Sequence, residues 1–124
     1  MKKLKNTVGE LNTMIMAGEI AKAFEKYYGE NVIIQVNGNS PVSGKEANRK
    51  REMIFLKEIE KLNSAEIKSV TFGGEDDNVS MTEWEINIEN KAGEEKTIYR
   101  VNVQHWKDDQ IINERLYFCG DQKF

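Results

Sequence analysis

Few side chains in this 124-residue sequence could do acid–base or nucleophilic chemistry in a buried site. The chain has one histidine, His105, and one cysteine, Cys119. These counts exclude an internal disulfide, a multi-histidine metal site and a cysteine-rich zinc site, and we expect neither a metal nor another cofactor. His105 falls on the outer face of the predicted sheet, and nothing near Cys119 would lower the pKa of its thiol. The strongest candidate for proton transfer is Glu114, the one carboxylate that we place inside the fold.

Glu114 belongs to a group of strands whose alternation predicts a buried face. In the segment 82–89, Trp84, Ile86 and Ile88 alternate with polar residues, as in a strand with one side in water. Together with the neighbouring strands, this face would carry aromatic side chains and a few polar groups, the usual composition of a small-molecule pocket. With Glu114 as the candidate catalytic group, our candidate ligand-binding residues are Trp84, Arg100, Asn102, Gln104, Trp106 and Leu116.

The register of the last hairpin decides which side chains face this pocket. Both faces of the segment 96–107 carry apolar residues, so the turn that follows has to settle the question. A three-residue bulged turn ending in Asp109 would place Asn102 opposite Glu114. A two-residue turn would instead pair Val103 with Glu114 and direct the other face inward. We predict the bulged turn.

Each candidate residue also has a structural interpretation. Burial would raise the pKa of Glu114 and leave it able to exchange a proton. An ion pair with Arg100, which lies diagonally across the strands in this register, would lower that pKa, and we favour this structural pair. The two tryptophans are more typical of core packing than of ligand stacking. A polar core network explains Asn102 and Gln104 as well as ligand binding does.

Composition limits the partners and the compartment. The chain has 18 basic and 21 acidic residues and a formal net charge of −3, which gives no positive field for nucleic acid or an anionic membrane. The basic cluster from Lys45 to Arg51 is interrupted by Glu46, as in a solvated helix face. No hydrophobic run is long enough for a membrane span or an export signal. An unpaired cysteine is typical of a reducing compartment, so we expect a cytoplasmic protein.

Helical patterns fill the first half of the chain and strand patterns the second. Capping-box patterns at Thr7 and Ser43 predict helix starts, a second helical segment covers 19–28, and the helix after Ser43 continues through Leu62. This order predicts one α+β domain over residues 1–124, with helices covering one face of a curved, mainly antiparallel sheet and residues 1–6 as a flexible N-terminus. The predicted strands are 32–36, 67–72, 79–89, 96–107 and 110–119.

Several short motifs occur in an order typical of a known superfamily. The opening motif is Met16-Ala17-Gly18-Glu19-Ile20, followed by Phe24 and Tyr28-Gly29-Glu30-Asn31-Val32, and a helix start follows at Ser43-Gly44-Lys45-Glu46-Ala47. The closing hairpin joins His105–Ile112 to Arg115–Phe118. Over residues 7–119 the chain resembles nuclear-transport-factor-2-like (NTF2-like) domains, and within them the SnoaL-like, or polyketide-cyclase-like, branch. The resemblance implies a cone-shaped α+β barrel with an internal cavity, commonly dimeric through the outer face of the sheet.

The catalytic residues of these relatives do not carry over to this chain. The resemblance implies a carboxylate base where this sequence has Val36, a second aspartate near Asn102, and a tyrosine near Leu11. In limonene-epoxide-hydrolase-like relatives an aspartate stands at the position of Leu116. Proton transfer needs a titratable group within hydrogen-bond reach, so ketosteroid-isomerase and epoxide-hydrolase activities are disfavoured.

Two functions from different classes remain open. The first is a small-molecule-binding domain with a cone-shaped pocket, in which Glu114 would serve isomerase, cyclase or hydratase chemistry on a partly apolar molecule. The alternative is a non-catalytic dimeric scaffold or protein-interaction domain with a filled core. An interior cavity large enough for a ligand would favour the first. In both cases the outer sheet face is too apolar for water, so we expect a homodimer through Val101, Val103, Arg115 and Tyr117.

Overall fold

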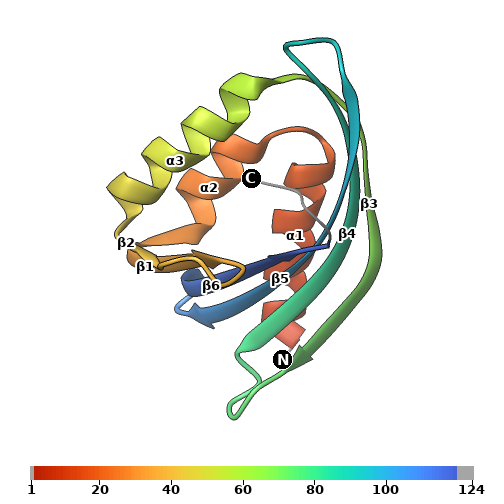
Figure 1. Cartoon of the computed structure of the whole chain (residues 1–124). Coiled ribbons are helices and arrows are strands. Elements are labelled where there is room, and N and C mark those ends of the chain that lie inside the picture. Colours follow the sequence, from red (N-terminus) through yellow and green to blue (C-terminus); the bar gives the residue numbers. More distant parts are fainter. Residues whose placement is uncertain (1, 120–124) are drawn as a thin grey trace.

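The structure of the chain is a computed structural model that describes residues 2–119 (Figure 1). Residues 1 and 120–124 of the predicted domain lie outside the described range. Its elements, in chain order, are α1 (Lys2–Met16), α2 (Ile20–Tyr27), β1 (Tyr28–Val36), β2 (Val42–Ser43), α3 (Lys45–Glu58), β3 (Ile59–Gly73), β4 (Val79–Asn90), β5 (Glu95–Lys107) and β6 (Gln110–Phe118). Residues 2–6, which we expected to precede the first helix, are part of α1. None of the described helices is long and apolar enough to cross a bilayer.

The six described strands form one curved sheet in the order β2-β1-β6-β5-β4-β3. β1 runs parallel to β6, and the other neighbouring pairs are antiparallel. Figure 1 shows the long strands β3, β4 and β5 bending around the helices, which lie on the concave side of the sheet. The predicted α+β arrangement, with helices covering one face of a curved and mainly antiparallel sheet, is confirmed; the sheet does not close on itself.

Apolar side chains of the concave face and of the helices make up the core. In β4, the side chains of Trp84, Ile86 and Ile88 are buried and alternate with more exposed neighbours, as the sequence pattern predicts. β5 adds Ile98 and β6 adds Ile111 to the same face. The helices close the core from the other side with Val8, Leu11, Ile15, Ala23, Phe24 and Tyr27.

Neither predicted capping box forms. Thr7 lies inside α1, where its hydroxyl donates to the backbone carbonyl of Lys3 at 3.1 Å. Ser43 belongs to β2 and pairs with Ile33 of β1. α3 begins after Gly44, whose φ of 95° lies in the left-handed region and which makes no side-chain cap. The chain therefore passes from strand to helix through a glycine that can adopt this backbone conformation, and not through a serine cap.

β3 starts much earlier than the sequence pattern indicates. We expected the third helix to continue through Leu62, but α3 ends at Glu58 and β3 begins at Ile59. Leu62 pairs with Ile88 on the buried face of β4, so the spacing that extends a helical stripe also fits this strand. Pairing with a long neighbouring strand outweighs the local helical periodicity.

The turn of the last hairpin also differs from our prediction. Asp108 and Asp109 both have positive φ angles, 53° and 62°. They form a two-residue turn between the paired residues Lys107 and Gln110, in place of the predicted three-residue bulged turn. Left-handed conformations at both central residues are what such a two-residue hairpin turn requires, and aspartate tolerates them better than most residues do.

A bulge in β6, beyond the turn, returns the predicted side chains to the buried face of the sheet. The pairing shifts by one residue at Ile112, so that Gln104, and not Asn102, lies opposite Glu114. The predicted pairing of Asn102 with Glu114 is therefore wrong by two residues. Because side chains alternate with a period of two, Asn102 and Glu114 still share the buried face of the sheet.

Candidate functional site

A cavity that is partly open to solvent lies between the concave face of the sheet and the helices. Its larger part, the apolar compartment, has a volume of about 260 Å³ and is walled mainly by Ile59, Leu62, Ala65, Ile86, Ile88 and Ile98. Its smaller part, the polar compartment, has a volume of about 70 Å³, and its polar wall consists of Tyr28, Asn48, Arg51, Glu52, Arg100, Asn102 and Glu114. Glu52 and Arg100 line both parts, so the two compartments adjoin.

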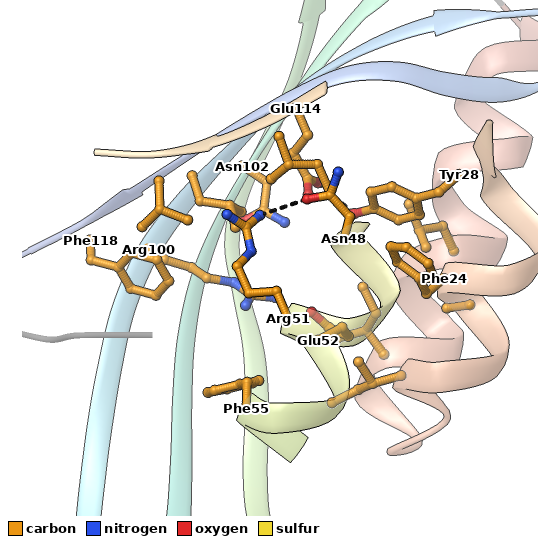
Figure 2. Close-up of a pocket in the computed structure, with 17 residues that line it drawn as sticks. Phe24, Tyr28, Asn48, Arg51, Glu52, Phe55, Arg100, Asn102, Glu114 and Phe118 are labelled. Atoms are coloured by element: carbon orange, nitrogen blue, oxygen red, sulfur yellow. Dashed lines mark hydrogen bonds between the residues drawn. The ribbon is translucent and has the colours of Figure 1, made fainter. Parts of the chain in front are cut away.

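Glu114 is the buried carboxyl group of the polar compartment (Figure 2). The residue is 3% exposed, and its Oε2 accepts hydrogen bonds from Tyr28 Oη and from Gln104 Nε2, both at 2.6 Å. The two donors come from the strands on either side, because β6 lies between β1 and β5. Both donors use the same oxygen, so among the described residues Oε1 is the atom left for a proton or a ligand.

A chain of hydrogen bonds fixes the orientation of the Gln104 amide. The indole N–H of Trp106 can only donate, and it donates to Ser80 Oγ at 2.9 Å. The Ser80 hydroxyl in turn donates to Gln104 Oε1 at 3.2 Å. With its carbonyl oxygen engaged, Gln104 directs its N–H toward Glu114. These side chains are all buried, so the network holds the carboxyl group in one position.

Two carboxyl and two guanidinium groups lie around the polar compartment: Arg51 and Glu52 of α3, Arg100 of β5 and Glu114 of β6 (Figure 2). Among the described residues, no ion pair at contact distance joins these carboxylates to these guanidinium groups. The predicted ion pair of Glu114 with Arg100 is therefore wrong. Arg51 also departs from the predicted solvated face, because it lines the compartment and its Nη2 donates to Asn48 Oδ1 at 3.0 Å.

Burial raises the pKa of both carboxyl groups. For Glu114, desolvation outweighs the hydrogen bonds from Tyr28 and Gln104 and the charge of Arg100, all of which lower the pKa. Desolvation likewise raises the pKa of Glu52 against the charge of Arg100. The pKa of Tyr28 lies well above its ordinary value of 10.0, because its hydroxyl is buried and donates to Glu114. Burial thus shifts the pKa of both carboxyl groups upward, opposite to the effect of the predicted ion pair.

Two buried polar atoms at the cavity wall have no hydrogen-bond partner among the described residues. They are the donor Arg100 Nε and the acceptor Asn102 Oδ1, and both residues line the polar compartment. Leaving such groups unpaired in the interior is costly, so these atoms mark positions for the polar groups of a ligand or for ordered water. Trp84 Nε1 is also unpaired, but Trp84 lines neither compartment.

The structure divides the predicted site residues into two groups. The residues at the cavity surface are Arg100, Asn102, Glu114 and Leu116. Those buried in the wall behind it, lining neither compartment, are Trp84, Gln104 and Trp106. Within residues 2–119, no group of three or more histidine, cysteine, aspartate or glutamate side chains could hold a metal ion.

Sequence reasoning missed four polar residues of the cavity wall, namely Tyr28, Asn48, Arg51 and Glu52. The spacing of three residues in α3 could have indicated two of these four. Asn48, Glu52 and Phe55 follow one another at steps of four and three residues, so they share one face of the helix. The mixed polarity of this face conceals it from a search for apolar stripes.

No protein family model and no curated protein matches this sequence. Solved structures do match. A Mesorhizobium loti protein described as a SnoaL-like polyketide cyclase is 19% identical, with 92% of this chain and 97% of that chain covered and a TM-score of 0.77. An NTF2-like protein of unknown function from Burkholderia pseudomallei is 10% identical, with 95% and 92% covered and a TM-score of 0.78. This chain has the NTF2-like fold.

Other proteins with this fold differ in the activity ascribed to them. A Bacillus subtilis protein described as an isomerase is 16% identical to this chain, with 94% of this chain and 86% of that chain covered and a TM-score of 0.77. At such identities the likeness establishes the fold and not the activity. The positions to which the resemblance assigns catalytic groups all line the polar compartment, and here they are Leu11, Val36, Asn102 and Leu116.

Proposed function

We propose that this NTF2-like protein binds a small, partly apolar molecule in its interior cavity. In any acid–base reaction on that molecule, Glu114 is the proton-transfer group. The observation that carries this proposal is a buried carboxyl group beside an apolar cavity, with one oxygen held by two donors and the other left over. Apolar space with a few convergent polar groups is the usual composition of a small-molecule site.

The volume of the apolar compartment supports binding over the filled-core alternative. Protein interiors have few voids larger than a water molecule, and an empty cavity lowers stability. The apolar compartment measures about 260 Å³, whereas an engineered apolar cavity of about 150 Å³ already binds benzene. A scaffold whose interior is only core has no use for such a space.

The environment of Glu114 supports acid–base chemistry. Its raised pKa brings the carboxyl group closer to the range in which it can both accept and return a proton. Isomerisation and cyclisation move a proton between two atoms of the substrate, and hydration moves one from a water molecule to the substrate, so one such carboxyl group can serve them. Asn102 Oδ1 and Arg100 Nε supply a free acceptor and a free donor to orient the substrate.

Native mass spectrometry of the freshly purified protein tests this proposal. We expect part of the 14.3 kDa chain to carry a noncovalent small-molecule adduct that is lost on collisional activation. Extraction and fragmentation of the adduct then identify the compound. Spectra without any adduct, even after incubation of the protein with a metabolite extract, would contradict small-molecule binding.

We further propose that two copies associate through the outer sheet face. Cross-strand rows on this face join Met81 to Val103 and Arg115, and Val101 to Tyr117. Tyr117 is 47% and Met81 42% exposed, while both valines are only partly buried. An apolar face of this kind in water favours a self-complementary two-fold contact.

Light scattering at micromolar concentration is expected to give a mass of about twice the 14.3 kDa chain. Val103→Lys adds a positive charge beside Arg115 in both copies, so we expect it to shift the mass to that of one chain. Asp76→Lys, in the exposed loop between β3 and β4, serves as the control and is expected to leave the dimer intact. A monomeric wild-type protein would exclude this assembly.

The thiol of Cys119 supports a cytoplasmic location. It is unpaired and exposed. In an oxidising compartment an exposed thiol tends to form a disulfide with another molecule, whereas it stays reduced in the cytoplasm. We therefore propose that the protein works in the cytoplasm.

A further inference from the structure

The two compartments of the cavity meet at a pair of charged side chains. Glu52 and Arg100 line both, and they are the charged residues in the described wall of the apolar compartment. Figure 2 shows Arg100 extending from β5 toward Glu52 on α3. A molecule whose apolar part fills the apolar compartment would therefore present its polar end to Arg100 and Glu52, with Glu114 beyond them.

The Nε of Arg100 has no acceptor among the described residues. This atom is buried, and no described carboxylate forms an ion pair with Arg100 at contact distance. A guanidinium group carries five N–H donors in a planar fork and keeps its charge in proteins. Because buried donors without acceptors are costly, Arg100 has donor capacity that an anionic oxygen would use.

The charged groups around Arg100 respond differently to burial. A buried carboxyl group can take up a proton and become neutral, whereas a buried guanidinium group cannot lose its proton. Burial raises the pKa of both Glu52 and Glu114, while Arg51 and Arg100 remain cationic. The guanidinium groups of Arg51 and Arg100 are therefore the fixed positive charges of this wall.

We propose that the ligand is an amphipathic carboxylate, with its apolar body in the apolar compartment and its carboxylate on the guanidinium group of Arg100. Arginine and carboxylate form paired, charge-assisted hydrogen bonds, which are among the strongest in proteins. Glu52 and Glu114 in their neutral forms can donate to the same carboxylate. This inference names the ligand class of the proposed function and rests on it.

Other head groups fit this site less well. An ammonium group would lie beside Arg51 and Arg100, and the Oε2 of Glu114 already accepts two hydrogen bonds. A neutral amide could accept from Arg100 but would leave its charge without a counterion. The charge of the head group is therefore the property to test.

Isothermal titration calorimetry with three probes that share one apolar body makes this test. The probes are phenylpropanoate, phenylpropanamide and phenylpropylamine, which carry an anionic, a neutral and a cationic head. We expect phenylpropanoate to bind at least about tenfold more tightly than the amide, because charge-assisted hydrogen bonds are about twice as strong as neutral ones. We expect the amine to bind most weakly.

Variants of Arg100 assign the preference to this side chain. In Arg100→Gln we expect phenylpropanoate and phenylpropanamide to bind equally, and in Arg100→Lys we expect part of the preference to remain, because the charge is kept and the fork is lost. Lys96→Gln, which removes a cation from the exposed start of β5, is the control and is expected to keep the full preference. Melting temperatures establish whether each variant is folded. If Arg100→Gln does not fold, the comparison of the three probes on the wild-type protein still tests the charge preference.

The binding data separate a failure of the inference about the head group from a failure of the proposed function. If the amide or the amine binds as tightly as the carboxylate, or if folded Arg100→Gln keeps the preference, the inference about the head group is overturned and small-molecule binding stands. If none of the three probes binds to the wild-type protein, the proposed function is overturned together with the inference.

Discussion

Glu114→Ala is expected to lower the free energy of unfolding by about 2–5 kcal/mol, because a buried donor left without a partner costs about 1–3 kcal/mol. The substitution leaves two such donors, Tyr28 Oη and Gln104 Nε2, and an additional void. Urea unfolding followed by the fluorescence of the two buried tryptophans measures the change. Glu75→Ala, in the exposed loop between β3 and β4, is the control and is expected within about 0.5 kcal/mol of the wild type.

Glu114→Gln separates the negative charge from the hydrogen bonds. Glutamine keeps an acceptor oxygen for Tyr28 and Gln104, so we expect a loss of less than about 1 kcal/mol in stability. Any proton-transfer activity is expected to be lost, because an amide does not titrate. If Glu114→Gln were as destabilising as Glu114→Ala, the charge itself would stabilise the fold, as in an ion pair with Arg100, and the proton-transfer role would be contradicted.

The raised pKa of Glu114 also predicts how stability depends on pH. A carboxyl group whose pKa in the folded protein exceeds its ordinary value of 4.5 binds more protons in the folded state, so its contribution to stability is lost as pH rises through the folded pKa. Glu52 acts in the same direction. The hydrogen bond from Arg49 lowers the pKa of Glu25, so the contribution of Glu25 to stability changes only below about pH 4.5. Between about pH 5 and about pH 8 we expect the wild type to lose more stability than Glu114→Gln, and the reverse order would contradict the raised pKa.

Ala65→Phe is expected to stabilise the protein while it blocks ligand binding. Ala65 lies on β3 opposite Ile86, and both residues line the apolar compartment. A larger side chain fills part of the void, and cavity-filling substitutions commonly add about 0.5–2 kcal/mol. The same ring takes the space of the ligand's apolar body, so we expect the affinity for phenylpropanoate to fall by at least about tenfold.

Thermal unfolding and calorimetry measure the two effects of Ala65→Phe separately. Ala47→Phe, on the exposed side of α3, is the matched control and is expected to leave the affinity unchanged. A folded Ala65→Phe variant with wild-type affinity would show that the ligand does not occupy the apolar compartment.

The side of the sheet that faces the interior could be predicted from the sequence, although the register of the last hairpin could not. The alternation of Trp84, Ile86 and Ile88 is strong enough to assign the face of β4 from sequence alone. For the last hairpin, the two-residue turn and the bulge at Ile112 each shift the pairing by one residue from our prediction. Both shifts leave Asn102 and Glu114 on the predicted face, because a shift of two residues does not change the side to which a side chain points.

The partners of Glu114 could not be predicted because they depend on contacts between distant segments. Tyr28 reaches Glu114 across 86 positions of the chain, through the parallel pairing of β1 with β6. Local sequence carries no signal for such a parallel neighbour. Glu52 comes from a helix whose inward face mixes charged and aromatic side chains, which hydrophobic periodicity does not detect.

A titration of methyl-labelled protein with phenylpropanoate, followed by heteronuclear NMR, tests most directly whether the interior cavity binds a small molecule. We expect saturable shifts of the methyl signals of Ile86, Ile88 and Ile98, whose side chains line the apolar compartment. The signals of Val101 and Val103 on the outer sheet face are expected to stay in place. The absence of shifts in the three isoleucines, or shifts confined to the two valines, would contradict a ligand site inside the fold.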